Sequence, residues 1–343
     1  MRDTLALGAL LAMISGLMNG SFTLPMRFLG RWDWEHVWSL FIFFSCLVMP
    51  TAIISLMAPQ SWLLIAHAPA AAVLIAVATG FAWGFGSLMF GQSVSAIGIS
   101  LANTLVLAIS SALGSLLPLL LLYQQKIHQP SGRSVLEGVV IVVVGITLCG
   151  YAGRLREKSN HGSSERGDLV GKARPVGVAL MLACGSGVLS AIFNIGFAMA
   201  QPISDYGQAN GLSAFASTNL IWWIMLASGS LANLGFCCYL FLKNHNFGRF
   251  LEPGGARLYG LSSLMALLWG GSIFVYGAAA PRLGKLGPSI GWPLSLATGL
   301  LLANAIGIGL GEWKHAPKRA LVWMYSGIVV LFMAIVVLSK AGA

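Results

Sequence analysis

Residues 70–92 read AAAVLIAVATGFAWGFGSLMFGQ and contain no charged side chain. A helix that crosses a membrane needs about 20 largely apolar residues, so this stretch is long enough to span one. Nine further stretches have a similar character. The sequence therefore predicts an all-α integral membrane protein with ten transmembrane helices. The other nine predicted spans are Thr4–Pro25, Val37–Met57, Ile97–Leu122, Val135–Gly153, Pro175–Ala200, Leu212–Leu242, Leu258–Ala279, Pro288–Gly311 and Leu321–Ser339.

The composition agrees with this class. Of the 343 residues, 57% are hydrophobic and 9% are charged, whereas a soluble domain carries about 25% charged residues. These figures exclude a soluble enzyme and a disordered chain. The net charge of +10 raises the question of a nucleic-acid partner. Nucleic-acid binding needs basic side chains on one face, and here they are scattered between apolar runs, so we expect membrane lipid and no nucleic acid as partner.

The positions of the basic residues predict the orientation. The loops after the odd-numbered spans hold 14 of the 20 lysines and arginines, and the other side holds the remaining 6. Cytoplasmic loops of membrane proteins are enriched in Lys and Arg. We therefore expect both termini on the periplasmic side.

No catalytic or metal-binding signature is present. The five cysteines all lie inside apolar spans without ligand spacing, which is typical of packing residues. The six histidines fall in loops or at span ends, where an interfacial role is expected. There is no phosphate-binding loop and no His-Glu-x-x-His motif. We expect no enzyme activity, no metal and no cofactor.

An internal repeat divides the chain. Trp83-Gly84 and Phe90-Gly91 recur as Trp269-Gly270 and Tyr276-Gly277, each at an offset of 186 residues. The division predicts two five-helix halves, residues 1–153 and 175–343, joined by a polar linker over 154–174. Five spans per half make the halves inverted in the membrane, an architecture typical of transporters that work by alternating access.

Most of the 42 glycines have a simpler explanation. Glycines at helical spacing let membrane helices approach closely. We expect this role for the pairs Gly16/Gly20, Gly80/Gly84 and Gly307/Gly311.

Neutral polar and aromatic side chains inside the spans are the candidate binding groups. An amide in hydrocarbon must find a hydrogen-bond partner, either on another helix or on a ligand in a cavity. Amides and hydroxyls recognise sugar hydroxyl groups, and flat aromatic faces pack against sugar C–H surfaces. The absence of a charge in mid-span disfavours a strongly ionic substrate. The candidate substrate-binding residues are Asn19, Trp83, Gln92, Asn103, Asn194, Asn219, Trp222, Trp269, Tyr276 and Trp292.

Acidic residues at span edges are the candidate proton-coupling groups. A proton-coupled carrier needs a group that can take up and release a proton inside the protein. Glu35, Asp205 and Glu312 lie at span edges and could face a cavity. The alternative for each of them is an interfacial salt bridge.

Several motifs resemble one bacterial family. The segment Trp32-Asp-Trp-Glu-His-Val-Trp38 resembles the Trp-x-Trp-Glu-x-x-Trp segment of the L-rhamnose–proton symporters. The segments starting at Ala152 (AGRLREK), Asn233 (NLGFC) and Glu312 (EW), and Lys318-Arg319, are similar to it in the same order over nearly the whole chain.

The resemblance implies a drug/metabolite transporter fold of ten helices in two inverted halves. It also implies uptake of L-rhamnose driven by a proton gradient across the bacterial inner membrane. By analogy with the family, spans 1, 3, 4, 6, 8 and 9, and often 7, line the cavity. Glu35 and Glu312 match family positions, and Asp205 lies where the family has an acid.

Four questions remain open at the level of sequence. The protein could be a uniporter or channel, because the sequence does not reveal the proton site. L-fucose or another 6-deoxyhexose could replace L-rhamnose as the neutral sugar that moves with H⁺. An exporter of drugs or amphipathic metabolites from the same superfamily would also suit an aromatic interior of low charge. The protein could be a monomer or a homodimer.

Overall fold

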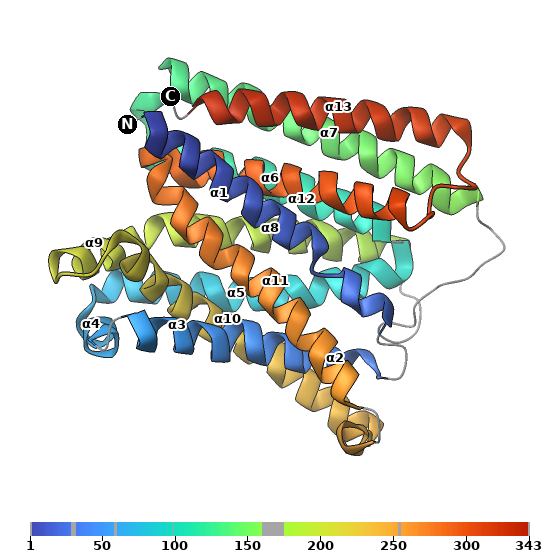
Figure 1. Ribbon diagram of the computed structural model, residues 1–343, viewed down its shortest axis with the longest axis horizontal. Coiled ribbons are helices and arrows are strands. Elements are labelled where there is room, and N and C mark those ends of the chain that lie inside the picture. Colours follow the sequence, from blue (N-terminus) through green and yellow to red (C-terminus); the bar gives the residue numbers. More distant parts are fainter. Residues whose placement is uncertain are drawn as a thin grey trace.

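The computed structural model describes residues 2–28, 32–57, 60–97, 99–159, 175–252 and 255–341. Within these residues the chain is helical and contains no strand (Figure 1). Ten helical segments are long and apolar enough to cross a membrane, which confirms the predicted number of spans. The helices of the spans are, in chain order, α1 (Arg2–Ser21), α2–η2–α3 (Trp34–Ile42, Phe43–Val48 and Met49–Met57), α5 (Ala70–Ile97), α6 (Ile99–Leu122), α7 (Pro130–Ser159), α8 (Val176–Met199), α10 (Ala214–Asn244), α11 (Gly255–Arg282), α12 (Gly287–Gly309) and α13 (Lys318–Ala341).

Short helices join these spans. Two of them, α4 (Ser61–His67) and α9 (Gln201–Ala209), pack near each other. The others are single turns, η1 (Leu24–Phe28), η3 (Gln124–Lys126), η4 (Phe247–Leu251) and η5 (Gly284–Leu286). The second span differs from the expected uniform helix, because η2 is a π-helical segment inside it.

The predicted linker begins later than expected. We predicted it over 154–174, but α7 continues to Ser159. Arg, Leu, Glu and Lys are good helix formers, so the apolar helix extends through the charged residues that follow it. Residues 160–174 lie outside the described residues, as does Gly98 at the predicted turn between the third and fourth spans.

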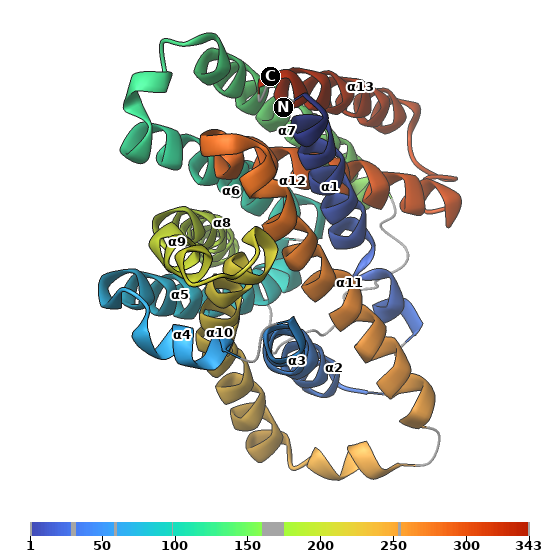
Figure 2. The same cartoon turned by 60° about the vertical axis from the view of Figure 1, so that its left-hand side comes forward.

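The helices pack in pairs that correspond between the first five and the last five spans. Helix α5 packs on α8, α6 on α8 and α6 on α7. Exchanging each span for the one five places away turns these pairs into α11 on α1, α12 on α1 and α12 on α13, which also pack together. The pairs α7–α13 and α6–α12 are unchanged by the exchange. Both termini lie at one end of the bundle (Figures 1 and 2), which we call the terminal end.

Glycines allow the closest of these contacts. A Cβ atom at Gly20 would lie 2.8 Å from the carbonyl carbon of Gly299, and one at Gly84 would lie 3.1 Å from the Ala232 side chain on α10. The predicted packing role is thus confirmed for Gly16, Gly20, Gly80 and Gly84, which face backbone atoms of α12 or α10. Gly311 is different, because it lies in the turn after α12 with a left-handed φ of 76°.

We expect Gly20→Ala to destabilise the fold. The new methyl group would overlap the backbone of Gly299, which cannot move as a flexible side chain could. Overpacking of this kind costs about 1–3 kcal/mol. Gly260→Ala on α11 is the matched control, since its Cβ would meet nothing within 4 Å. Thermal unfolding in detergent should give a lower midpoint for Gly20→Ala only; equal midpoints would contradict the close packing of α1 on α12.

Candidate functional site

A cavity of about 150 Å³ lies between six helices in the middle of the bundle. Its walls come from α1, α5, α6, α8, α11 and α12, which are spans 1, 3, 4, 6, 8 and 9. These are the six spans that the family resemblance implied. No charged side chain from the described part of the chain is among the lining residues. The cavity is therefore suited to a neutral solute.

Five of the ten candidate binding residues line this cavity. They come from four different helices, so that only the tertiary fold brings them together. They are Asn19, Trp83, Trp269, Tyr276 and Trp292.

Two repeat-related tryptophans lie face to face at the cavity. The rings of Trp83 and Trp269 stack with a centroid distance of 5.2 Å and an interplanar angle of 13°. Phe193 packs on Trp83 from α8, with a centroid distance of 5.0 Å. Stacked aromatic rings present a rigid apolar surface at little entropic cost.

Serine hydroxyls provide polar groups that the sequence did not single out. Five serines line the cavity, and three of them are already hydrogen-bonded across helices. Ser15 on α1 shares a hydrogen bond with Ser295 on α12 (3.1 Å), and the Trp292 indole N–H donates to Ser110 on α6 (3.2 Å). Serine is common in the spans, and no signal in the chain distinguished these positions. The five lining serines are Ser15, Ser110, Ser190, Ser272 and Ser295.

Asn194 lies behind the cavity wall and not on its surface. The Tyr276 hydroxyl donates to its Oδ1 (2.5 Å), and its Nδ2 donates to the carbonyl oxygens of Gly114 (2.8 Å) and Pro288 (3.1 Å). The Gly114 carbonyl lacks its usual helical donor, because the residue four places on is Pro118, which has no N–H. Asn194 is fully buried and joins α8 to α6, α11 and α12.

The other candidate residues do not line the cavity. Trp222 is fully buried and stacks on Phe197, with a centroid distance of 4.3 Å and an angle of 8°. Asn219 is buried beside Met57. Gln92 and Asn103 are half-buried on α5 and α6.

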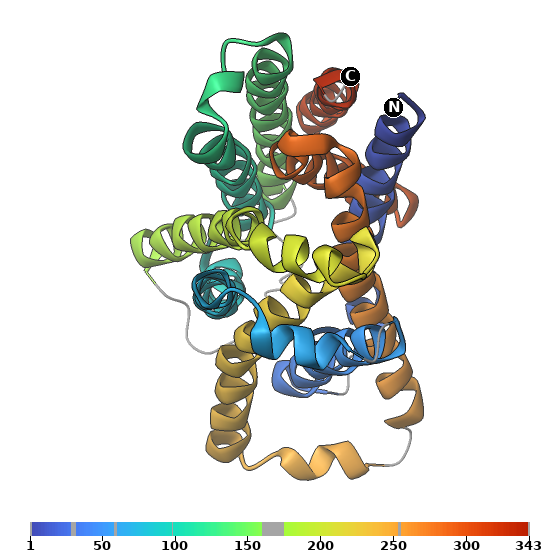
Figure 3. The same ribbon diagram turned by 90° about the vertical axis from the view of Figure 1, so that its left-hand side faces the viewer.

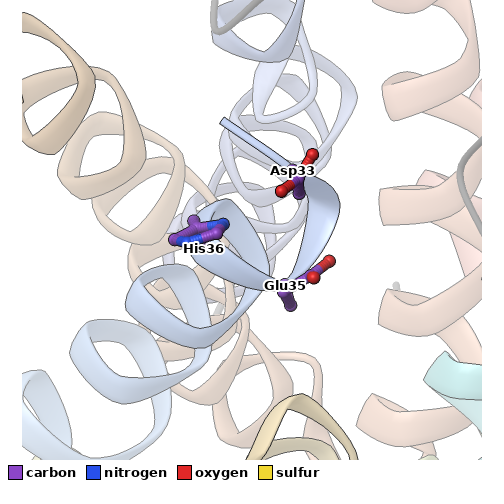
Figure 4. A group of neighbouring side chains, drawn as sticks. All are labelled: Asp33, Glu35 and His36. Carbon is purple, nitrogen blue, oxygen red and sulfur yellow. The ribbon is translucent and has the colours of Figure 1, made fainter. Parts of the chain in front are cut away.

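Glu35 is the buried member of the three candidate acids. Its side chain starts on the first turn of α2 (Figure 4), and the residue is 4% exposed. Its Oε1 accepts hydrogen bonds from Nδ2 of Asn244 and of Asn246, both at 2.7 Å. Within the described residues, no lysine or arginine forms an ion pair with it. Among the described residues, the side chains that donate to Glu35 are thus two neutral amides.

Neighbouring groups link α2 to the end of α10. Asp33 accepts from Arg249 (2.8 Å) and from Asn246 (2.7 Å). Asp33, Glu35 and His36 could each offer a metal ligand atom within 4.8 Å of one another. The two carboxylates already accept hydrogen bonds from Asn244, Asn246 and Arg249. The group therefore joins α2 to the end of α10.

His36 differs from the prediction. We expected every histidine in an interfacial position, and His36 is fully buried. Its ring packs against Phe241 and Phe250, at centroid distances of 5.0 and 4.8 Å, and its Nε2 is 3.0 Å from the backbone oxygen of Asn246. The prediction was wrong because α10 and η4 cover the first turn of α2, a long-range contact that local sequence does not reveal.

Like Glu35, the remaining two acids are not among the residues that line the cavity. Glu312 pairs with Arg156 at the end of α7 (2.9 Å), as the salt-bridge alternative proposed. Asp205 is exposed on α9. Burial, together with the negative charge of Asp205, raises the pKa of Tyr123 above its usual value, which places this acid near the turn after α6.

Comparison with known proteins identifies the family. Residues 1–342 match the family model of the L-rhamnose-proton symport protein. An L-rhamnose-proton symporter of Salmonella dublin is 25% identical over 341 residues, covering 97% of each chain. A protein of the same name from Salmonella gallinarum is 24% identical over the same length and coverage. This chain, with its ten apolar helices around a neutral cavity, therefore belongs to the L-rhamnose-proton symport protein family.

Proposed function

We propose that this protein carries L-rhamnose together with a proton into the cell across the bacterial inner membrane. The observation that carries the proposal is the central cavity, which combines aromatic faces with hydroxyl and amide groups and has no charged side chain among its described lining residues. Family membership and the names of the relatives support the same substrate pair.

The cavity chemistry suits a deoxysugar. The hydroxyl groups of a pyranose can bond with Asn19 and with the lining serines. The C–H face and the methyl group of a 6-deoxyhexose can pack on the rings of Trp83 and Trp269. Ligand sites generally have such apolar walls with a few placed polar groups.

An inverted repeat and alternating access are part of the proposal. The correspondence of helix pairs between the two halves supports it, as does the stacking of Trp83 on Trp269, the residues related by the offset of 186. Rocking of two such halves around a central site would expose the cavity to each side in turn. The 14 to 6 distribution of basic residues supports a periplasmic terminal end.

Glu35 is our first choice for the proton site. It is buried at a span edge, and its hydrogen-bond partners are neutral amides that a protonated carboxyl could also use. Glu312 is instead neutralised by Arg156, and Asp205 faces solvent.

Ligand-induced stabilisation tests the substrate. We expect L-rhamnose to raise the thermal midpoint of the purified protein more than L-fucose, and glucose and mannose to have no effect. A ligand at 100 times its Kd stabilises the state it binds by about 2.7 kcal/mol. Uptake of labelled L-rhamnose into vesicles with an imposed pH gradient is the second measurement.

Two results would redirect the proposal. A larger rise of the thermal midpoint with L-fucose than with L-rhamnose would make L-fucose the proposed substrate of the same class of carrier. No shift with any sugar, together with resistance of expressing cells to cationic dyes, would favour the exporter.

A further inference from the structure

Two aromatic rings line the cavity toward the terminal end, since Tyr276 lies in the last seven residues of α11 and Trp292 in the first six of α12. Tyr276 and Trp292 meet edge to face, with a centroid distance of 5.5 Å and an angle of 71°. Each ring is held by one hydrogen bond from another helix: Tyr276 by Asn194 at 2.5 Å, and Trp292 by Ser110 at 3.2 Å. The two rings are therefore positioned by contacts between helices and not within one.

Buried hydroxyl groups without partners lie next to this wall. Ser115 and Ser289 follow directly the two residues whose carbonyls bind Asn194, and both are fully buried. Neither hydroxyl has a hydrogen-bond partner in the part of the chain that the structure describes. Elsewhere in the spans serines bond to their own helix, as Ser230 does to Ala227 (2.7 Å). An unsatisfied buried hydroxyl costs about 1–3 kcal/mol, so these two groups need an explanation.

Two of the unsatisfied groups lie on the terminal side of the cavity. Six of the eight unpaired buried atoms in the described residues belong to helices that meet at Tyr276 and Asn194, and two of these six are the hydroxyls of Ser115 and Ser289 beside the residues that bind Asn194. Asn194 lies in the last six residues of α8, and Ser289 is the third residue of α12. These ends of α8 and α12 are on the side that holds the two termini, which faces the viewer in Figure 3.

We propose that Tyr276 and Trp292 form the gate of the cavity at the terminal end, with Asn194 as its latch. Behind the gate, Ser115, Ser289 and the amide of Asn194 form a second binding site for a neutral polyhydroxylated solute. In the closed state the two hydroxyls are unpaired; when the gate opens, water or the hydroxyl groups of an entering sugar bond to them. The sugar as ligand of this second site rests on the proposed function, whereas the gate does not.

Cysteine labelling tests the gate. In a variant without the five native cysteines, Ser115→Cys and Ser289→Cys are treated with a membrane-impermeant maleimide from each side of the membrane. We expect both to react from the face that also labels Ser339→Cys near the C-terminus. Ser230→Cys is the matched control, since it is 1% exposed but bonded within its own helix, and should not react.

The latch gives a quantitative expectation. Removing one hydrogen bond that holds the closed state changes the equilibrium by about tenfold, since such a bond is worth about 1–1.5 kcal/mol. Tyr276→Phe, which removes one such bond, should therefore speed the labelling of Ser115→Cys roughly tenfold, and Asn194→Ala, which removes three, should speed it at least as much. In the Ser115→Cys variant that keeps Asn194, L-rhamnose at a saturating concentration should slow the labelling.

The outcomes separate the two proposals. No labelling at either position while uptake continues would overturn the gate. Labelling that no sugar slows would overturn the second binding site. If both cysteines react from the expected face but L-rhamnose neither slows the labelling nor gives a thermal shift, the gate stands and the proposed substrate fails.

Discussion

Glu35→Gln is expected to abolish the accumulation of L-rhamnose while leaving sugar exchange intact. Glutamine keeps the oxygen that accepts from Asn244 and Asn246 but can no longer carry a proton. One charge moving through 100 mV is worth about 2.3 kcal/mol, which corresponds to roughly 40-fold accumulation for one coupled proton. The measurement is the ratio of L-rhamnose inside to outside the vesicles under an imposed gradient. This ratio should be about 40 for the unmodified protein and about 1 for Glu35→Gln, the value expected without a gradient.

Asp205→Asn and Glu312→Gln are the controls for this result. Asp205 is exposed, and the pair of Glu312 with Arg156 is partly exposed, where an ion pair contributes only about 0–1 kcal/mol. Both variants should accumulate the sugar. If Asp205→Asn equilibrates the sugar and Glu35→Gln concentrates it, the proton site lies at Asp205.

Trp269→Ala is expected to weaken sugar binding strongly. The change removes the ring that stacks on Trp83 and enlarges the cavity. Truncating a buried aromatic side chain lowers the free energy of unfolding by about 3–5 kcal/mol. If the sugar packs on this ring as a neighbouring side chain does, part of that free energy is lost from binding. Binding should weaken by about 100-fold, since 1.4 kcal/mol corresponds to a factor of ten. Quenching of tryptophan fluorescence by L-rhamnose measures the change.

Trp269→Phe and Trp62→Ala separate binding from stability. Phenylalanine keeps an aromatic face in the cavity and should restore a large part of the affinity. Trp62 lies outside the cavity on α4, is 40% exposed, and should be dispensable for binding. Unchanged affinity in Trp269→Ala would remove the stacked pair from the site.

Only five of the ten candidate binding residues line the cavity, and this difference has a physical cause. Asn19 and Asn194 are chemically alike in the sequence, yet one lines the cavity and the other binds the carbonyl that Pro118 leaves without a donor. Lipid tails and helix interiors are similarly apolar, so hydropathy does not distinguish the buried face of a span from its outer face. For the same reason hydropathy does not reveal Ser110 and Ser295, which line the cavity because α6 and α12 pack together.

The class of protein, the ten spans and the family follow from the amino-acid sequence. Long apolar stretches require membrane helices because every backbone polar group must be bonded within the bilayer, and this holds whatever the helices pack against. The tertiary structure alone decided that Trp83 meets Trp269, that His36 is buried, and that Asn194 holds Tyr276. These contacts join residues far apart in the chain, and they depend on which helix faces meet and not on the local composition of any one span.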